Sequence, residues 1–383
     1  MDANNTVTYV TSNDEFNALC EKWQKLSAIA IDTEFMRTNT FYAKIGLLQI
    51  ADRERIYLID PLEIKDWDGF RNLLNSPDCT IVVHSAGEDL NLLLTHIGCL
   101  PCCLFDTQIA AAFLGYGFSL SYQALVEKLV GVTVEKGETR SDWLRRPLSP
   151  SQLQYAASDV LYLLEVADTL RESLIEKSRL SWFASECQLL LSAAEQVEDE
   201  ANWGLLYANV SNSWRLNDQA LKYLKTLCIW RERESRERNR PRSWIAKDND
   251  LYSLAESAAG FESITEESLK SIKVQETKFL SRYAKEFKKL LSESKSDLAT
   301  DKSVLNYPLE SSDRKVLKKL QKVVETKAEE FNLAPELLGR KKHLLEIIKR
   351  FKLSGKVSWE EANNDWRSQL LETEFSKLLK VGG

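Results

Sequence analysis

The stretch IAIDTEFM, residues 29–36, sets two carboxylates two positions apart at the end of an apolar run. The Ile-Ala-Ile segment that opens it has the pattern of a strand buried on both faces. Alternate side chains of a strand share a face, so Asp32 and Glu34 are expected to point the same way and to lie close together. Two like charges in an apolar setting resist ionisation, which is an arrangement that folding alone does not favour.

The bulk composition is that of an ordinary globular protein. The 383 residues are 44% hydrophobic and 28% charged, and the length predicts two or three domains. The first ten residues, MDANNTVTYV, lack the basic region and apolar core of a secretory signal, and no apolar run reaches membrane-spanning length. The seven scattered cysteines are typical of reduced thiols. We therefore expect a cytoplasmic protein with no membrane partner.

Charge is distributed unevenly along the chain. Residues 1–200 carry 16 Lys and Arg against 30 Asp and Glu, whereas the remaining residues carry 35 against 27. An acidic front half joined to a basic back half suggests catalysis at one end and polyanion contact at the other. Solvated charged faces are the alternative explanation for such runs.

Short apolar runs alternate with helical patterns in the front half, which predicts an α/β domain with a mixed sheet. Strands are expected at residues 28–35, 46–51, 56–60, 81–84 and 104–105, with ADRERI turning the second strand into the third. Helices are expected at residues 14–25, 88–96, 107–114, 122–129 and 151–176. From residue 216 onward only amphipathic helical patterns remain, and the polar stretch 292–303 is expected to be a linker.

Two further carboxylates occur where an α/β site would need them. TIVVHSAGEDLNLLL, residues 80–94, predicts a strand, a turn and a helix, with Asp89 in the first helical turn at the carboxyl edge of the sheet. SQLQYAASDVLYLL places Tyr155 and Asp159 four residues apart, hence on one helical face. Taken singly, Asp89 is equally explained as a helix cap and Asp159 as an exposed helical residue.

A carboxylate pair on a strand, a third opening a helix and a fourth four residues after a tyrosine occur in this order in the DEDD exonucleases. The chain resembles the tyrosine-bearing branch of that superfamily and, within it, the ribonuclease D family. The resemblance covers nearly all of residues 7–180 and is carried by IDTEFMR, GLLQI, LIDP, HSAGEDL, DTQIAAAFLG and SDWLRRPLSPSQLQYAASDVLYL. The histidine branch would carry His five residues before the last aspartate, where this chain has Gln154.

The resemblance implies a ribonuclease-H-like exonuclease domain that hydrolyses the terminal phosphodiester of RNA from its 3' end and releases nucleoside 5'-monophosphates. It also implies two divalent metal ions, Mg²⁺ or Mn²⁺, which would relieve the repulsion between the carboxylates. By resemblance, Asp32 bridges both ions, and Glu34 and Asp159 hold the ion that carries the attacking water. Asp89 would support the other ion through water, and Tyr155 would hold the attacking water.

Weaker candidates could contact the substrate. Phe35 would stack on the terminal base, or else pack in the core. His84 lies near the sheet edge, where a structural histidine with satisfied hydrogen bonds is the alternative. A group before the predicted catalytic helix could grip phosphates, or could be a solvated loop: Arg140, Trp143, Arg145 and Arg146. Asp106 is expected to cap the following helix rather than to bind metal.

The helical half resembles two HRDC domains, the helicase and ribonuclease D C-terminal type. The first match begins with LNDQALKYLKTLCIW, and the second is FNLAPELLGRKKHLLEIIKR. Residues 231–242 hold six Arg and three Glu between Trp230 and Trp244, which suits phosphate and base contact; a salt-bridged solvated helix is the alternative. Expected domains are residues 1–206, 212–292 and 297–376.

Two other functions are compatible with the residues. One is a DNA exonuclease of the same chemistry, and the other is a non-catalytic nucleic-acid-binding scaffold that kept the fold. The presence of all four carboxylates and the tyrosine disfavours the scaffold. The resemblance implies RNA partners with a free 3' end, above all transfer RNA precursors, and we expect a monomer.

Overall fold

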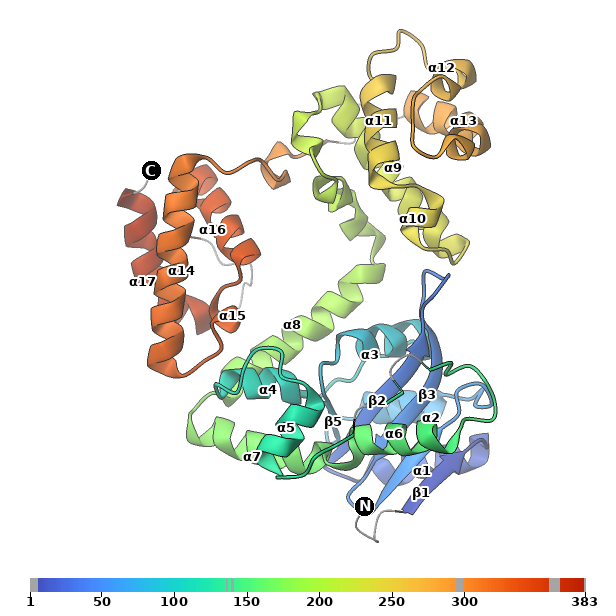
Figure 1. Cartoon of the computed structure of the whole chain (residues 1–383), viewed down its shortest axis with the longest axis vertical. Coiled ribbons are helices and arrows are strands. Elements are labelled where there is room, and N and C mark those ends of the chain that lie inside the picture. Colours follow the sequence, from blue (N-terminus) through green and yellow to red (C-terminus); the bar gives the residue numbers. More distant parts are fainter. Residues whose placement is uncertain (1–5, 136, 139–140, 294–298, 358–365, 382–383) are drawn as a thin grey trace. The chain divides into compact units, whose positions relative to one another are not determined.

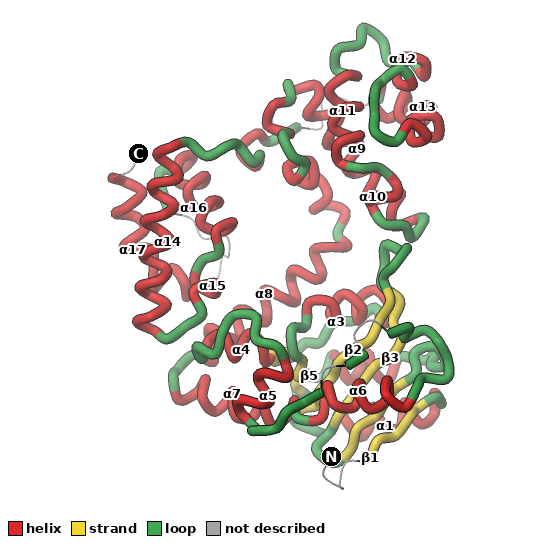
Figure 2. The backbone as a smooth tube through the Cα atoms, in the orientation of Figure 1, coloured by secondary structure: helices red, strands yellow, loops and turns green. Residues whose placement is uncertain are grey.

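The structure is a computed structural model that describes residues 6–135, 137–138, 141–293, 299–357 and 366–381. The chain forms two compact units that interleave in sequence. The first unit comprises residues 1–36, 44–195 and 310–383, and the second comprises residues 37–43 and 196–309. Figure 1 colours the elements in chain order, and Figure 2 separates helices from strands.

A six-stranded mixed sheet in the order β1-β4-β3-β2-β5-β6 forms the base of the first unit. Its strands are β1 (Thr6–Val10), β2 (Ala28–Met36), β3 (Lys44–Ala51), β4 (Arg55–Ile59), β5 (Thr80–Val83) and β6 (Leu104–Asp106). The β2–β3 and β3–β4 pairs are antiparallel, and the other pairs are parallel. The predicted mixed α/β sheet is therefore confirmed. The sequence pattern missed β1, a short edge strand of which only Val10 is buried.

The strand register places the predicted carboxylates in the middle of the sheet. In the antiparallel β2–β3 pair, Asp32 lies opposite Gln49, and Glu34 lies opposite Leu47. The expected hairpin between β3 and β4 is present. Asp52 stabilises its turn by accepting hydrogen bonds from the backbone N–H groups of Glu54 and Arg55. Opposed residues of an antiparallel pair project to the same face, so Gln49 and Leu47 share the face of the two carboxylates.

Helices pack on the sheet, and one predicted helix is divided. They are α1 (Asn13–Trp23), α2 (Asp68–Leu74), α3 (Gly87–Leu92), the π-helical turn η1 (Leu93–Ile97), α4 (Thr107–Phe113), α5 (Tyr122–Leu129), α6 (Pro150–Leu161), α7 (Leu163–Glu176) and α8 (Leu180–Glu198). The helix expected over 151–176 is interrupted at Tyr162, whose backbone N–H donates to the Tyr122 hydroxyl (3.1 Å). As a result α6 packs on β2, β3 and β4, whereas α7 packs on β2 and β5 (Figure 1).

The last four helices belong to the first unit: α14 (Ser311–Phe331), α15 (Pro335–Leu338), α16 (Lys341–Ser354) and α17 (Trp366–Val381). An ion pair and a hydrogen bond connect α17 to Glu186 of α8. Arg367 pairs with Glu186 through two nitrogen–oxygen contacts of 2.6 and 2.7 Å, and the Trp366 indole donates to the same carboxylate (3.0 Å). Trp366 also stacks on Trp182, with ring centroids 5.2 Å apart.

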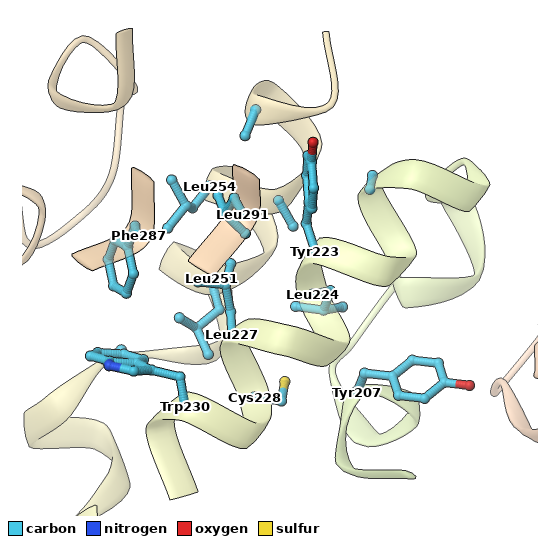
Figure 3. Packing of buried hydrophobic residues seen from close by; sticks show 14 of the residues in the cluster. Tyr207, Tyr223, Leu224, Leu227, Cys228, Trp230, Leu251, Leu254, Phe287 and Leu291 are labelled. Carbon is cyan, nitrogen blue, oxygen red and sulfur yellow. The ribbon is translucent and has the colours of Figure 1, made fainter. Parts of the chain in front are cut away.

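The second unit is helical throughout its described residues, apart from loops, as the pattern beyond residue 216 predicts. Its elements are the 3₁₀ turns η2 (Glu200–Asn209), η3 (Ser213–Arg215) and η4 (Lys302–Val304), and the helices α9 (Asp218–Glu237), α10 (Arg242–Ile245), α11 (Asp248–Ala258), α12 (Glu266–Lys270) and α13 (Thr277–Ser292). Leucines of α9 and α11 surround Trp230 and Phe287 in its core (Figure 3). Trp230 is only 5% exposed, so its ring stabilises the helical fold.

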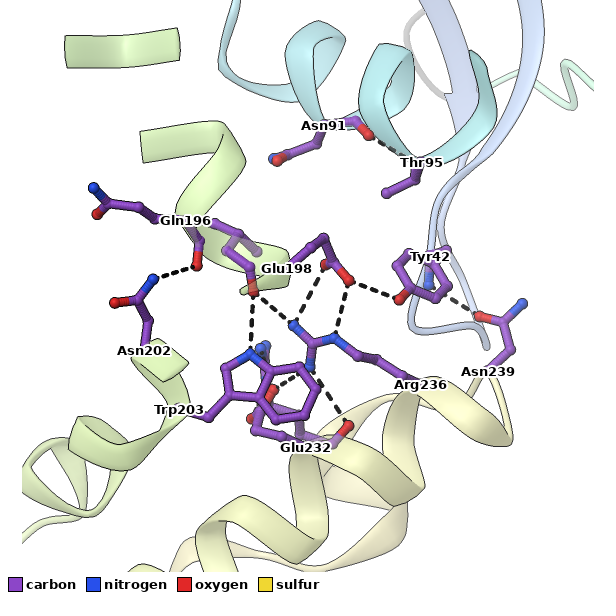
Figure 4. A network of polar contacts seen from close by, with 12 residues as sticks. Tyr42, Asn91, Thr95, Gln196, Glu198, Asn202, Trp203, Glu232, Arg236 and Asn239 are labelled. Carbon is purple, nitrogen blue, oxygen red and sulfur yellow. Dashed lines mark hydrogen bonds and ion pairs between the residues drawn. The ribbon is translucent and has the colours of Figure 1, made fainter. Parts of the chain in front are cut away.

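Within the described residues, carboxylates pair with five of the six arginines of segment 231–242. Arg236 pairs with Glu198 (3.1 Å) and with Glu232 (2.5 Å) (Figure 4). Arg242 also pairs with Glu232. The further ion pairs of the segment are Arg231 with Asp248, Arg233 with Glu200 and Arg238 with Glu234. These contacts match the salt-bridged alternative for this segment.

The loop that connects β2 to β3 belongs to the second unit rather than to the sheet. Asn239 accepts hydrogen bonds from the backbone N–H groups of Phe41 and Tyr42, each 3.0 Å long. The Tyr42 hydroxyl donates to Glu198 (2.8 Å; Figure 4). The Arg236 guanidinium lies 4.5 Å from the Phe41 ring centroid. The loop is thereby fixed by polar and cation–π contacts.

No helix in the described residues is both long enough and apolar enough to cross a bilayer. The predicted linker, residues 292–303, includes residues 294–298, which lie outside the described part of the chain, and its last residues enter η4.

Asp106 connects β5, β6 and α4. Its side chain is 1% exposed overall and accepts hydrogen bonds from the backbone N–H groups of Ser85 (3.1 Å), Ala86 (2.9 Å) and Gln108 (2.8 Å). The predicted helix cap is confirmed, and the same carboxylate also holds the turn that leads into α3.

The substitution Asp106→Ala should lower the free energy of unfolding by about 2–4 kcal/mol, because it leaves several buried N–H donors without an acceptor. Denaturation in guanidinium chloride measures this change. The matched control is Asp78→Ala, which removes an exposed aspartate and should change stability by less than about 0.5 kcal/mol. Equal effects of the two substitutions would contradict the assignment.

Candidate active site

Three carboxylates from two elements meet over the middle of the sheet. Asp32 and Glu34 come from β2, and Asp159 comes from α6; one oxygen of each lies within 4.8 Å of the others. Asp159 is 9% exposed, and the two β2 carboxylates are half-buried. The alternation along β2 and the helical spacing on α6 therefore converge as the sequence predicts.

The start of α6 sets the position of its two functional side chains. Ser149 caps the helix by accepting from the Gln152 N–H (3.1 Å), and the Gln152 side chain accepts from the Ser149 N–H (2.9 Å). Pro150 at the first helical position fits this capping box because it has no N–H to satisfy. One turn later, Tyr155 and Asp159 follow on the face that meets β2.

Asp89 lies at the edge of this group, in the first turn of α3, and is 7% exposed. Thr33, between the two β2 carboxylates in sequence, donates its hydroxyl proton to Asp89 Oδ1. Asp89 is outside the three-residue group, but its negative charge raises the pKa of both Asp32 and Glu34. Thr33 was not among the predicted site residues, because its only signal in the sequence is a hydroxyl between two carboxylates.

Burial is the largest cause of the raised carboxyl pKa values at the site. It raises the pKa of Glu34 to about 8 and the pKa of Asp89 and of Asp159 to about 7. The pKa of Asp32 lies well above its ordinary value, first through burial and then through the charges of Asp89, Asp159 and Glu34. The group therefore resists carrying its full negative charge without a cation.

A divalent cation fits this donor set. The group offers only carboxylate oxygens, which are the ligands that Mg²⁺ and Mn²⁺ prefer, and these oxygens are already close enough to share an ion. A bound cation would also offset the repulsion that, after burial, raises the pKa of Asp32 and of Glu34.

Tyr155 stands beside the carboxylates. Burial and the neighbouring negative charges of Asp159, Glu34 and Asp32 raise the pKa of its phenol, which also hydrogen-bonds to Asp159. Its ring lies 6.2 Å from that of Trp143, centroid to centroid. The phenol is therefore protonated at neutral pH and directed at the carboxylate group.

The predicted substrate contacts His84, Phe35 and Arg145 differ in their burial and in their hydrogen bonds. Both ring nitrogens of His84 are occupied, Nδ1 by the Thr107 hydroxyl (2.9 Å) and Nε2 by the Leu120 carbonyl (3.0 Å). This satisfied arrangement agrees with the structural alternative for His84. Phe35 is half-buried directly after the carboxylate strand segment, and Arg145 is exposed.

Arg146 and Trp143 are built into the fold. Two guanidinium nitrogens of Arg146 each lie 2.6 Å from an oxygen of Asp60, and the Gly46 and Trp143 carbonyls accept further hydrogen bonds from it. Trp143 is 1% exposed. Its carbonyl oxygen lies so close to Gly46 that a Cβ atom on residue 46 would be 2.6 Å from it. Arg140, the remaining predicted phosphate contact, lies outside the described residues.

Known proteins are similar to this chain in sequence and in fold. Residues 7–175 match the 3'-5' exonuclease family, and residues 220–291 match the HRDC domain. The chain is similar to ribonuclease D of Pseudomonas paraeruginosa (36% identity over 357 residues, 91% of each chain) and of Escherichia coli K12 (32% over 378 residues, 97% of this chain and 98% of the relative). The crystal structure of Escherichia coli ribonuclease D, described as an exoribonuclease involved in structured RNA processing, matches with a TM-score of 0.83 and 29% identity over 98% of this chain and 99% of that one.

The metal-free protein should lose stability as the pH rises from about 5 to about 8. Glu34, Asp89 and Asp159 have folded pKa values of about 8, 7 and 7, whereas unfolded carboxyl groups titrate near about 4. The folded state therefore binds more protons in this interval, and linkage makes its free energy of unfolding fall with rising pH. Thermal melts in EDTA between pH 5 and 8 measure the effect.

Asp32→Asn should flatten that pH dependence and raise the melting temperature in EDTA at pH 8, because it removes one repelling charge. Mg²⁺ should stabilise the wild type at pH 8 and have little effect on this variant. A wild-type melting temperature in EDTA that rises from pH 5 to 8 would contradict the electrostatic account of the site.

Proposed function

The chain belongs to the ribonuclease D family of 3'-5' exoribonucleases, and we propose that its carboxylate group binds two divalent metal ions, Mg²⁺ or Mn²⁺. The observation that carries the proposal is the convergence of Asp32, Glu34 and Asp159 within 4.8 Å, with an all-oxygen donor set. In this assignment Asp32, Glu34 and Asp159 would hold the ions, and Asp89 would support them from the edge of the group. The raised carboxyl pKa values support it, because they mark a site that lacks a positive charge.

The chemistry follows from the residues around that group. When bound, the divalent ions neutralise the carboxylates and offset the negative charge that develops on the phosphate during hydrolysis. Tyr155 donates its hydroxyl proton to Asp159, which leaves the phenol oxygen free to accept a hydrogen bond from the attacking water. Because its raised pKa keeps the phenol protonated, Tyr155 orients the water rather than removing its proton.

The enzyme acts on RNA from the 3' end. We propose that each cycle cleaves the terminal phosphodiester and releases a nucleoside 5'-monophosphate, with Phe35 stacking on the terminal base and Arg145 near the phosphates. Transfer RNA precursors are the proposed natural substrates, which is consistent with structured RNA processing by the Escherichia coli relative. We further propose that the protein is a cytoplasmic monomer. Its proposed domains are residues 1–206, 212–292 and 297–376.

Lysines of α14 are better placed to contact RNA than the arginine-rich segment. Within the described residues Lys315, Lys318 and Lys319 are exposed and form no ion pair, and helical spacing sets them on one side of α14. By contrast, Arg233 and Arg238 already face carboxylates. Free surface cations release counterions when they meet phosphates, which is the main electrostatic source of affinity for nucleic acids.

Digestion of matched RNA and DNA oligonucleotides tests the function. With Mg²⁺ and a free 3'-hydroxyl, the RNA should shorten stepwise from that end and yield nucleoside 5'-monophosphates, and Asp159→Asn should be inactive. Faster cleavage of the DNA strand would favour the DNA exonuclease, and binding without cleavage of either strand would favour the scaffold.

Tyr155→Phe deletes only the hydroxyl and keeps the ring against Trp143. It should reduce the single-turnover rate by a factor on the order of 10²–10³, because the attacking water loses its hydrogen-bond acceptor. RNA affinity and Mn²⁺ affinity should change little. A single-turnover assay with saturating enzyme separates this step from product release, and a wild-type rate for the variant would remove Tyr155 from the mechanism.

The triple substitution of Lys315, Lys318 and Lys319 by Gln should weaken binding of a structured RNA and reduce its dependence on salt. Loss of three phosphate contacts lowers the slope of log affinity against log salt by about 2 to 3. Binding of a catalytically inactive Asp159→Asn protein, measured from low to moderate salt, gives this slope. The matched control, Arg233→Gln with Arg238→Gln, should leave the slope unchanged; a reversed pattern would assign RNA contact to α9.

A further inference from the structure

Gln49 is a buried polar side chain that the chemistry above does not use. It lies in β3, is 0% exposed, and neither its amide nitrogen nor its amide oxygen has a hydrogen-bond partner within the described residues. Burial of an amide without a hydrogen bond is unfavourable, and an apolar residue of the same shape would avoid that loss. An unpaired amide at such a position therefore indicates a role other than packing.

The register places this amide beside the carboxylate of Asp32, on the same face of the sheet. Gln49 lies opposite Asp32 in the antiparallel β2–β3 pair, so both side chains project to the same face with Cβ atoms about 4.5–5.5 Å apart. That face is the one covered by α6, because Asp159 of α6 meets Asp32 and Glu34 there. The β4 residue opposite Gln49 is Leu58, whose side chain has no polar atom.

We propose that Gln49 is a positioning residue whose amide, unpaired in the metal-free protein, donates its N–H to the carboxylate of Asp32 when metal binds and so fixes that carboxylate. The inference rests on the proposed metal site. Carboxylates that bind metal are oriented by hydrogen bonds from neighbouring groups, and loss of such a partner weakens metal binding. An amide suits this task because it supplies a donor without a positive charge, whereas Lys or Arg at this position would compete with the cation for Asp32.

Gln49→Leu tests the proposal, because leucine has a similar volume and no polar atom. Isothermal titration of the full-length protein with Mn²⁺ alone should give a dissociation constant raised about 10-fold or more. The melting temperature in EDTA should stay the same or rise, because the unpaired amide is gone. Turnover at limiting Mn²⁺ should fall, while the KM for RNA stays near the wild-type value.

Two further variants keep the test decisive. Leu48→Met alters the neighbouring residue of β3, which is 0% exposed and faces the other side of the sheet, and it should leave Mn²⁺ affinity unchanged. Gln49→Met supplies a flexible apolar side chain in case leucine disturbs the packing, and it should weaken Mn²⁺ binding as leucine does.

The outcomes separate this inference from the metal assignment itself. Unchanged Mn²⁺ affinity in both Gln49 variants would overturn the positioning role, whatever happens to their melting temperatures, while loss of Mn²⁺ binding in Asp32→Asn would still uphold the metal site. Retention of wild-type Mn²⁺ binding by Asp32→Asn would instead overturn the proposed function.

Discussion

Electrostatic repulsion among Asp32, Glu34 and Asp159 is the constraint on which the first unit depends. Their burial raises each carboxyl pKa, so the group opposes its own assembly whenever it is charged. Apolar packing overcomes this opposition from two directions. The Ile-Ala-Ile run of β2 is completely buried, and α6 buries small and branched residues against the sheet while it carries the third carboxylate. Because both elements are regular and well packed, the repulsion cannot be relaxed by a small local movement.

The fold distributes counter-charges selectively. Asp60 has Arg146, Glu186 has Arg367, and Asp106 has several backbone N–H groups. Within the described residues no Lys or Arg forms an ion pair with Asp32, Glu34, Asp89 or Asp159. Hydroxyl groups are used instead, from Thr33 to Asp89 and from Tyr155 to Asp159. The protein therefore orients these carboxylates without neutralising them, which leaves the positive charge to be supplied from outside the chain.

The sequence predicted the features that have a strong local period. Alternation along β2 and the four-residue spacing of Tyr155 and Asp159 gave the shared face correctly, because both periods are geometric properties of strand and helix. Features that depend on distant partners were not predictable. The edge strand β1 has too little buried surface to show a pattern, and the break before α7 depends on the Tyr122 hydroxyl. The ion pairing of the arginine-rich segment was predictable only in part, because Glu232 and Glu234 lie one helical turn from their arginines whereas the other carboxylate partners come from distant parts of the sequence.

The β2–β3 loop has a consequence for how this protein can be divided. The strand that carries Asp32 and Glu34 continues into Phe41 and Tyr42, whose backbone donors are satisfied by Asn239 of the second unit. The two units are therefore not continuous in sequence. Residues 37–43 of the second unit interrupt the first, and residues 310–383 return to the first unit after the second. A truncation after residue 195 would remove Asn239 and leave the two backbone N–H groups and the two aromatic rings of Phe41 and Tyr42 facing water. Replacement of the helical half would therefore also change the surroundings of this loop, a dependence between distant positions that arises from connectivity rather than from catalysis.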